Sequence, residues 1–161
     1  MEEIELTING ETYSDEVEPG RTLREFLRYD LGLTGTKEGC ETGKCGVCTV
    51  LLDGNPVKSC LMLAHQADGE ELVTIEGLDE QVESELHPVQ ESFVDNFASQ
   101  CGYCIPGMVM TSVGLLEEGD DLSREEIRGR LDGNICRCTG YRKIVDAVEE
   151  VANADVDVTL P

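Results

Sequence analysis

Residues 39–50, GCETGKCGVCTV, contain three cysteines within nine positions. The spacing is Cys-x4-Cys-x2-Cys, and a fourth cysteine follows after eleven further residues. The four thiols belong to Cys40, Cys45, Cys48 and Cys60. Three glycines in the same loop allow the backbone to come close to the sulfurs, some of them at positive φ, so that N–H groups can point at buried negative charge. These glycines are Gly39, Gly43 and Gly46. The stretch therefore predicts a metal-binding loop with thiolate ligands.

The spacing in this loop is that of the plant-type [2Fe–2S] ferredoxins, with the last ligand closer in sequence than in the free carriers. Zinc is an alternative, but structural zinc sites usually use paired short-spaced cysteines, which this loop matches poorly. A disulfide framework fits less well because no secretory signal accompanies the cysteines.

A second group of four cysteines lies in the later part of the chain. Cys101-x2-Cys104 falls between two expected helices, and Cys136-x-Cys138 falls between the next two. In an up-and-down bundle these two junctions lie at the same end, so the four thiols can converge. The residues alone leave zinc open here, because Cys-x2-Cys pairs are common zinc ligands. A single residue between the other two cysteines is unusual for a tetrahedral zinc chelate.

The first half of the chain has the pattern of a β-grasp ferredoxin domain, expected at residues 1–78. Alternating apolar residues predict strands at the start, and Asn9-Gly10 predicts a tight hairpin. A capping box at Thr22 and Glu25 predicts one amphipathic helix over residues 22–31, on which Arg24 and Arg28 share a face that could dock a partner. Further strands are expected at residues 12–17, 49–52, 57–60 and 72–76.

The second half has helical periodicity and predicts a four-helix domain at residues 87–153. Pro88, Pro106 and a capping box at Ser123 mark three helix starts. The expected inward or shared-face residues are Val89, Phe93, Val94, Phe97, Val109, Met110, Val113, Leu116, Ile144, Val145, Val148, Val151 and Ala152. An acidic linker is expected at residues 79–86, and a tail at 154–161 that is loosely ordered or docked on a partner. The predicted fold class is α+β.

The charge balance limits the possible partners. Twelve basic and 34 acidic residues give a net charge of -22, which makes nucleic acid or an anionic membrane surface an unsuitable partner. The acidic residues are spread along the chain and lysine is scarce, as expected for a protein of a halophile. The acidic N-terminus is unlike a signal peptide, and no apolar run is long enough to span a membrane. A cytoplasmic protein is expected.

Four stretches together resemble the iron–sulfur subunit of the molybdenum hydroxylases, the family of xanthine dehydrogenase, aldehyde oxidoreductase and carbon monoxide dehydrogenase. They are GCETGKCGVCTV, SCL around Cys60, QCGYCIPGM at residues 100–108 and GNICRCTGY at residues 133–141. The resemblance covers residues 2–153. It implies a β-grasp domain and a four-helix domain, each holding one [2Fe–2S] cluster.

The resemblance also implies an electron-transfer role. Electrons would pass from molybdopterin in a large subunit to the cluster of the helical domain, then to the ferredoxin-type cluster, then to FAD in a medium subunit. Gln100 and Cys138 would touch the pterin; without the resemblance, Gln100 would be a backbone-capping amide. The resemblance ends where the family's short subunit ends, which implies a separate polypeptide in a heterotrimer.

No catalytic residue is expected in this chain, because the cysteines are ligands and no nucleophile and base can be paired. The substrate of the complex stays open among carbon monoxide, aldehydes, purines and other N-heterocycles. The alternative function is a free-standing [2Fe–2S] ferredoxin with a structural zinc-binding helical domain.

Overall fold

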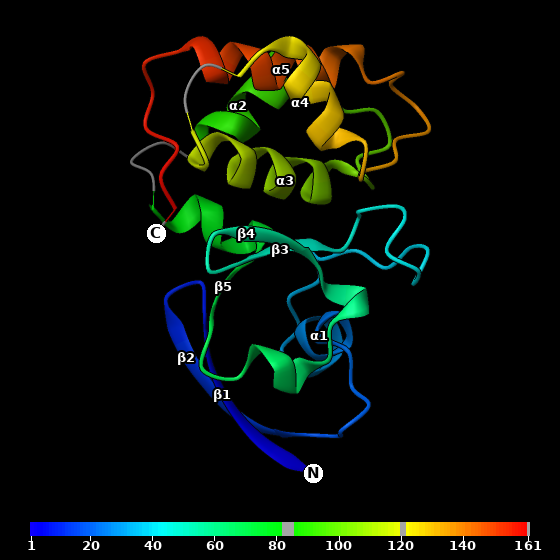
Figure 1. The fold of residues 1–161 in the computed structure, drawn as a ribbon, viewed down its shortest axis with the longest axis vertical. Coiled ribbons are helices and arrows are strands. Elements are labelled where there is room, and N and C mark those ends of the chain that lie inside the picture. Colours follow the sequence, from blue (N-terminus) through cyan, green and yellow to red (C-terminus); the bar gives the residue numbers. More distant parts are fainter. Residues whose placement is uncertain (82–85, 120–121, 161) are drawn as a thin grey trace.

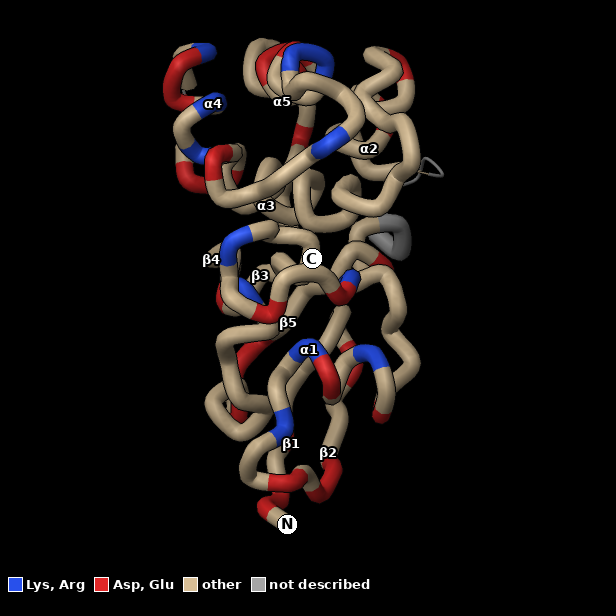
Figure 2. The backbone as a smooth tube through the Cα atoms, turned by 90° about the vertical axis from the view of Figure 1, so that its right-hand side faces the viewer, with Lys and Arg blue, Asp and Glu red and all other residues tan. Residues whose placement is uncertain are grey.

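The computed structural model describes residues 1–81, 86–119 and 122–160. Figure 1 shows a sheet and short helical turns in the lower part of the molecule and a layer of helices above them. The fold is mixed α+β, as predicted. Figure 2 shows Asp and Glu along the whole height of the molecule, from the first hairpin to the helical layer.

The sheet has five strands in the order β2-β1-β5-β3-β4. Within the described part of the chain, only the pairing of β1 with β5 is parallel. The bounds are β1 (Glu2–Ile8), β2 (Glu11–Val17), β3 (Thr49–Leu52), β4 (Asn55–Lys58) and β5 (Glu71–Val73). Asn9 and Gly10 have φ values of 52° and 81°, which confirms the first predicted hairpin. Asp53 and Gly54, at 48° and 77°, turn the second hairpin in the same way.

Two of the expected strands were misplaced. Residues 59 and 60 leave the ladder and enter a 3₁₀ turn, η2 (Ser59–Leu61), because β3 begins at Thr49, which pairs with Lys58. The last strand ends at Val73, since the N–H of Thr74 donates to the side chain of Asn9 at 2.8 Å. A second 3₁₀ turn, η3 (Ala64–Ala67), lies between β4 and β5.

The expected ten-residue α-helix is shorter and changes its winding. The α-helical part is α1 (Leu23–Glu25), capped by the predicted Thr22 and Glu25 box, and it continues as the π-helix η1 (Phe26–Asp30). The N–H of Leu31 passes the carbonyl four residues back and donates to Phe26 at 3.1 Å, which widens the last turn. Leu23, Phe26 and Leu27 are fully buried against the sheet.

Four helices form the upper layer, as predicted. They are α2 (Pro88–Asp95), α3 (Ile105–Glu117), α4 (Arg124–Leu131) and α5 (Arg142–Asn153). Ser123 and Glu126 form the predicted capping box. The predicted face of α2 is wrong in part: Val94 is 61% exposed and Phe97 is 72% exposed. Phe97 follows the end of the helix with a φ of 51°, which turns its side chain away from the core.

One continuous core joins the sheet to the helices. Leu51 and Val73 of the sheet pack with the buried residues of the four helices. The 3₁₀ helix η4 (Ile75–Gln81) occupies the start of the expected linker, while residues 82–85 of that linker lie outside the described part. The tail docks on this chain itself: Val158 and Leu160 pack against the helical core, and the N–H of Leu160 donates to Glu117 at 2.6 Å.

Candidate metal centres

The first cysteine loop directs backbone N–H groups at sulfur. The N–H groups of Thr42 and Cys45 donate to Cys40 Sγ at 3.4 and 3.3 Å, and the N–H of Cys40 donates to Cys45 Sγ at 3.4 Å. The hydroxyl of Thr42, followed by its N–H, lowers the pKa of Cys40 to about 6. The loop therefore favours the thiolate at Cys40, which is the form that binds metal.

Two glycines make this loop geometry possible. A Cβ on Gly39 would lie 2.8 Å from Cys45 Sγ, so any side chain there would collide with the sulfur. Gly43 has the predicted positive φ, 72°, and a Cβ on it would lie 2.3 Å from the side chain of Leu61. The backbone thus wraps closely around the thiols.

Cys48 and Cys60 form the inner pair of this group. Cys48 is only 2% exposed, and Cys60 lies on η2. The hydroxyl of Ser59 donates to the carbonyl of Cys48 at 2.7 Å, which holds η2 against the cysteine loop. Burial, and next the neighbouring Cys48 thiol, raises the pKa of Cys60 to about 11. A bound metal cation would favour loss of the Cys60 thiol proton.

The second group is brought together from the two helix junctions. Cys101 precedes α3 and Cys104 is the N-cap of α3, while Cys136 and Cys138 lie between α4 and α5. The Sγ atoms of Cys101 and Cys138 are 3.6 Å apart, and both residues are exposed. Cys104 and Cys136 are buried. Burial, and next the Cys136 thiol, raises the pKa of Cys104 to about 12.

Hydrogen-bond donors surround Cys136. Burial alone would raise the pKa of its thiol, but the hydroxyl of Thr139 and the N–H groups of Cys138 and Thr139 lower it overall. The N–H of Cys136 donates to the hydroxyl of Tyr141 at 2.9 Å. Tyr141 itself has a φ of 67° and precedes α5. Its hydroxyl therefore supports the cysteine loop.

Thiols of the same group lie close to one another. Cys40 and Cys45 are joined by two N–H···Sγ hydrogen bonds, and the Sγ atoms of Cys101 and Cys138 are 3.6 Å apart. In residues 1–81, 86–119 and 122–160, no group of three or more His, Cys, Asp or Glu side chains is placed to hold a metal ion. A [2Fe–2S] cluster binds four thiolates as two pairs, one pair on each iron, whereas structural zinc takes four ligands on one ion. Four thiols in each group match the donor set of a [2Fe–2S] cluster.

The two cysteine groups lie on the same side of the molecule and are joined by hydrogen bonds. Figure 1 shows the cyan loop of the first group and the orange loop of the second at the right of the molecule. The N–H of Ile135 donates to the carbonyl of Cys45 at 2.8 Å, and the amide of Asn134 donates to the carbonyl of Gly46 at 3.2 Å. The hydroxyl of Tyr103 donates to the carbonyl of Glu38. The groups therefore belong to one connected unit.

The predicted docking role of Arg24 and Arg28 is not supported by the structure. Arg24 is 3% exposed and forms ion pairs with Glu38 at 2.6 Å and Glu41 at 3.0 Å, both in the cysteine loop. Arg28 donates to the carbonyls of Thr34 and Thr36 at 2.7 and 2.8 Å. Both arginines hold the start of the loop against the helix.

Gln100 is exposed and directly precedes Cys101. It therefore lies beside the exposed pair of the second group. Three residues around the cysteines were not found from the sequence: Lys58, Thr111 and Asn134. The hydroxyl of Thr111 donates to Asn134 Oδ1 at 3.0 Å, and Lys58 Nζ approaches the same oxygen at 3.5 Å. Asn134 lies within the GNIC stretch at residues 133–136, so its position beside Cys136 could be read from the sequence. No sequence pattern indicates its contact with Lys58.

Two protein families match consecutive parts of the chain. Residues 6–75 match the family described as "2Fe-2S iron-sulfur cluster binding domain", and residues 74–149 match the "[2Fe-2S] binding domain" family. The fold and the two groups of four thiols thus define a protein with two [2Fe–2S]-binding domains. Among the described residues, no helix is long and apolar enough to cross a lipid bilayer.

Full-length relatives identify the family. The chain is 48% identical to the nicotinate dehydrogenase small FeS subunit of Eubacterium barkeri, over 90% of this chain and 91% of the relative. It is 45% identical to the xanthine dehydrogenase iron-sulfur-binding subunit of Escherichia coli O157:H7, over 90% and 91%. The crystal structure of quinoline 2-oxidoreductase from Pseudomonas putida 86 matches with a TM-score of 0.88 and 48% identity, over 94% of this chain and 92% of that chain. The chain belongs to the iron–sulfur small subunits of the molybdenum hydroxylases.

Proposed function

We propose that this chain relays single electrons within a molybdenum hydroxylase complex. The observation that carries the proposal is the presence of two groups of four thiols on loops that are hydrogen-bonded to each other. A [2Fe–2S] cluster supplies one-electron redox chemistry when bound. The chain contributes the ligands, their separation and the hydrogen bonds that tune them. It is an oxidoreductase subunit and holds no catalytic residue of its own.

The proposed ligands are the four cysteines of each group. Cys40, Cys45, Cys48 and Cys60 hold the first cluster, and Cys101, Cys104, Cys136 and Cys138 hold the second. The proposed domains are residues 1–78 and 87–153, separated by a linker at residues 79–86. The matches of the chain to two [2Fe–2S]-binding domain families support this assignment.

The proposed route runs from molybdopterin in a large subunit to the second group, then to the first group, then to FAD in a medium subunit. Support comes from exposure: Gln100, Cys101 and Cys138 form an accessible edge of the second group. Gln100 and Cys138 would contact the pterin at this edge. The buried pair, Cys104 and Cys136, lies on the same junctions away from solvent.

The substrate proposed for the complex is an N-heterocycle or an aldehyde. Relatives are named for nicotinate, xanthine and caffeine dehydrogenation, and others are named aldehyde oxidoreductase. Substrate choice would lie in the large subunit, because this chain has no substrate-binding chemistry. A cytoplasmic location is part of the proposal, because eight cysteines stay reduced and available to metal in that compartment.

Metal analysis and EPR of the dithionite-reduced full chain test the relay. We expect about four irons per chain and two distinguishable one-electron signals. One signal with about two irons and stoichiometric zinc would instead indicate a ferredoxin with a structural zinc domain. Cys136→Ser should remove only the second signal and Cys45→Ser only the first. Loss of both signals in both variants would contradict two separate sites.

A further inference from the structure

Lys58 lies between the two cysteine groups. It ends β4 two residues before Cys60, and its Nζ donates to Thr49 Oγ1 at 3.0 Å and to Asn134 Oδ1 at 3.5 Å. Thr49 and Asn134 are each only 2% exposed. Thr49 belongs to the strand that leaves the first cysteine loop, and Asn134 precedes Cys136 by two residues. The ammonium group is thus in contact with both halves of the protein.

Asn134 has a fixed orientation. Its Oδ1 accepts from the hydroxyl of Thr111 at 3.0 Å, and its Nδ2 donates to the carbonyl of Gly46 at 3.2 Å. If the amide were flipped, its N–H groups would face the donating Thr111 hydroxyl and the Lys58 ammonium. The acceptor that faces Lys58 is therefore held from both α3 and the first cysteine loop, and the position of the ammonium is restricted.

Lys58 is linked most directly to the first group. It lies two residues before Cys60, and its Nζ donates at 3.0 Å to Thr49, the residue after Cys48. Its contact with Asn134 on the side of the second group is longer, at 3.5 Å. A partly buried charge at a fixed place is screened less by salt than an exposed one. In a chain with a net charge of -22, this is a localised positive charge next to the strand that leaves the first cysteine loop.

We propose that Lys58, held by Thr49 and Asn134, raises the reduction potential of the cluster on the first group relative to the cluster on the second. Adding an electron makes a thiolate-bound cluster more negative, so a nearby fixed cation stabilises the reduced form. The exchange moves one electron from the second cluster, which is oxidised, to the first, which is reduced; no bond breaks and no proton is required. Lys58 is a positioning residue that gives the relay its direction, and the inference rests on the proposed function.

The test is an EPR-monitored redox titration of the full chain with both clusters bound. Lys58→Met should lower the midpoint potential of the first cluster and leave the second nearly unchanged. We expect the equilibrium constant for electron exchange to fall about tenfold, which corresponds to about 59 mV for one electron. Lys58→Arg keeps the charge and should keep most of the potential difference.

Lys44→Met is the matched control. Lys44 also neighbours a thiol in sequence, Cys45, but its side chain is exposed. Its removal should change the potentials little, and less still in high salt. Equal shifts in Lys44→Met and Lys58→Met would overturn the proposal, because the fixed position of Lys58 would then have no special effect. An unchanged first potential in Lys58→Met would overturn it as well.

The experiment also distinguishes loss of the first cluster in Lys58→Met from failure of the proposed relay function. If Lys58→Met does not retain its first cluster, Lys58→Gln is titrated against Lys58→Arg, and equal potentials in that pair overturn the proposal. If the unmodified chain shows one EPR signal and bound zinc, the relay function fails, independently of Lys58. Two clusters with no dependence on Lys58 charge would leave the relay intact and reject only the role of this lysine.

Discussion

The N–H of Ile135 and the carbonyl of Cys45 form a 2.8 Å hydrogen bond between the two cysteine loops. Ile135 is the residue before Cys136. This bond therefore brings the backbone beside Cys136 of the second group into contact with the backbone of Cys45 of the first. Asn134 reinforces the contact through Gly46. Packing within this chain therefore holds the two groups together.

Gly107→Ala should loosen this contact. A Cβ on Gly107 would lie 2.2 Å from the carbonyl oxygen of Gly46 and 3.0 Å from Val47 Cα, both backbone atoms that cannot rotate away. We expect a loss of about 1–3 kcal/mol in the free energy of unfolding, measured in urea. Gly129→Ala on α4 is the control, because nothing lies within 4 Å of its Cβ. It should stabilise the helix by about 0.5–1 kcal/mol, and equal effects of the two changes would contradict the close approach.

Arg24→Met should weaken the first cysteine loop. Arg24 is buried, but Glu38 and Glu41 are 45% and 51% exposed and can be solvated after its loss. We therefore expect a cost of about 1–3 kcal/mol, below that of a fully buried pair, and faster loss of the first EPR signal to a chelator. Arg124→Met removes ion pairs to Asp146 and Glu149 from a side chain that is 40% exposed, and it should destabilise the chain less than Arg24→Met does. If Arg24→Met loses its first EPR signal to the chelator no faster than the unmodified chain does, Arg24 does not stabilise the first cysteine loop.

The local features of this fold could be predicted from the sequence. The Asn9-Gly10 hairpin and the Thr22 and Ser123 capping boxes depend on contacts within a few residues, and all three are found. The two cysteine groups follow from spacing for the same reason. The family match then supports two [2Fe–2S]-binding domains, while the individual ligands remain predictions.

Features that depend on distant contacts could not be predicted. Lys58 and Asn134 are 76 residues apart, and no local pattern shows that their side chains meet. The helical spacing of Arg24 and Arg28 indicated an exposed face, because the loop that covers them comes later in the chain. The winding of η1 likewise depends on how Leu31 hydrogen-bonds at the end of the helix.

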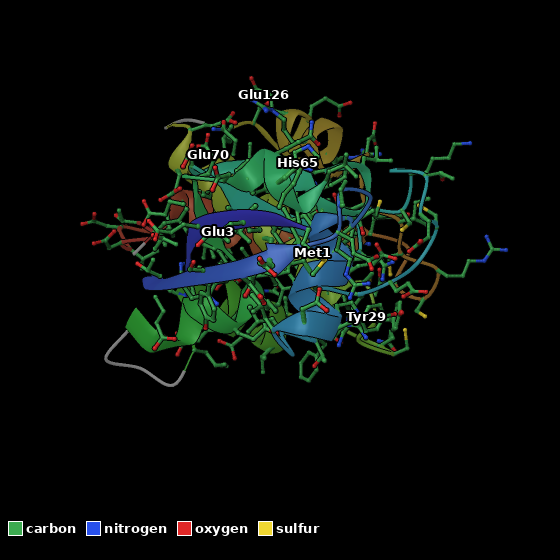
Figure 3. All side chains as sticks on the ribbon, turned by 90° about the horizontal axis from the view of Figure 1, so that it is seen from below. Met1, Glu3, Tyr29, His65, Glu70 and Glu126 are labelled. Atoms are coloured by element: carbon green, nitrogen blue, oxygen red, sulfur yellow. The ribbon has the colours of Figure 1, made fainter. Side chains whose placement is uncertain are left out.

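Glu16→Lys should stabilise the first hairpin in low salt. Glu16 lies directly opposite Glu3 in the pairing of β2 with β1, and like charges at such positions are destabilising. Figure 3 shows Glu3 on the face of β1 seen from below, where it is exposed. An opposite-charge pair should add about 0.2–1 kcal/mol to the free energy of unfolding.

The gain from Glu16→Lys should disappear in 1 M KCl, where the Debye length is about 3 Å. Glu16→Gln removes the repulsion without adding attraction and should give a smaller gain in the free energy of unfolding.

Over the same salt range, the unmodified chain should show a rising melting temperature, as its net charge of -22 predicts for a protein adapted to salt. A melting temperature independent of KCl would count against a halophilic source.

The thiols should differ in reactivity once iron is removed. The pKa of Cys40 is lowered to about 6 by Thr42, so most of this thiol is ionised at pH 7, whereas the pKa of buried Cys104 is raised to about 12. Limited iodoacetamide treatment of the iron-free chain should therefore label Cys40 at least about tenfold faster than Cys104, as measured by peptide mass spectrometry. Lowering the pH from 7 to 5 passes through the pKa of Cys40 and should slow its labelling about tenfold, because the thiolate is protonated. Thr42→Val should slow Cys40 at pH 7 by removing the donated hydroxyl. Labelling of Cys104 as fast as Cys40 would show that its burial depends on bound iron and not on the packing of α3.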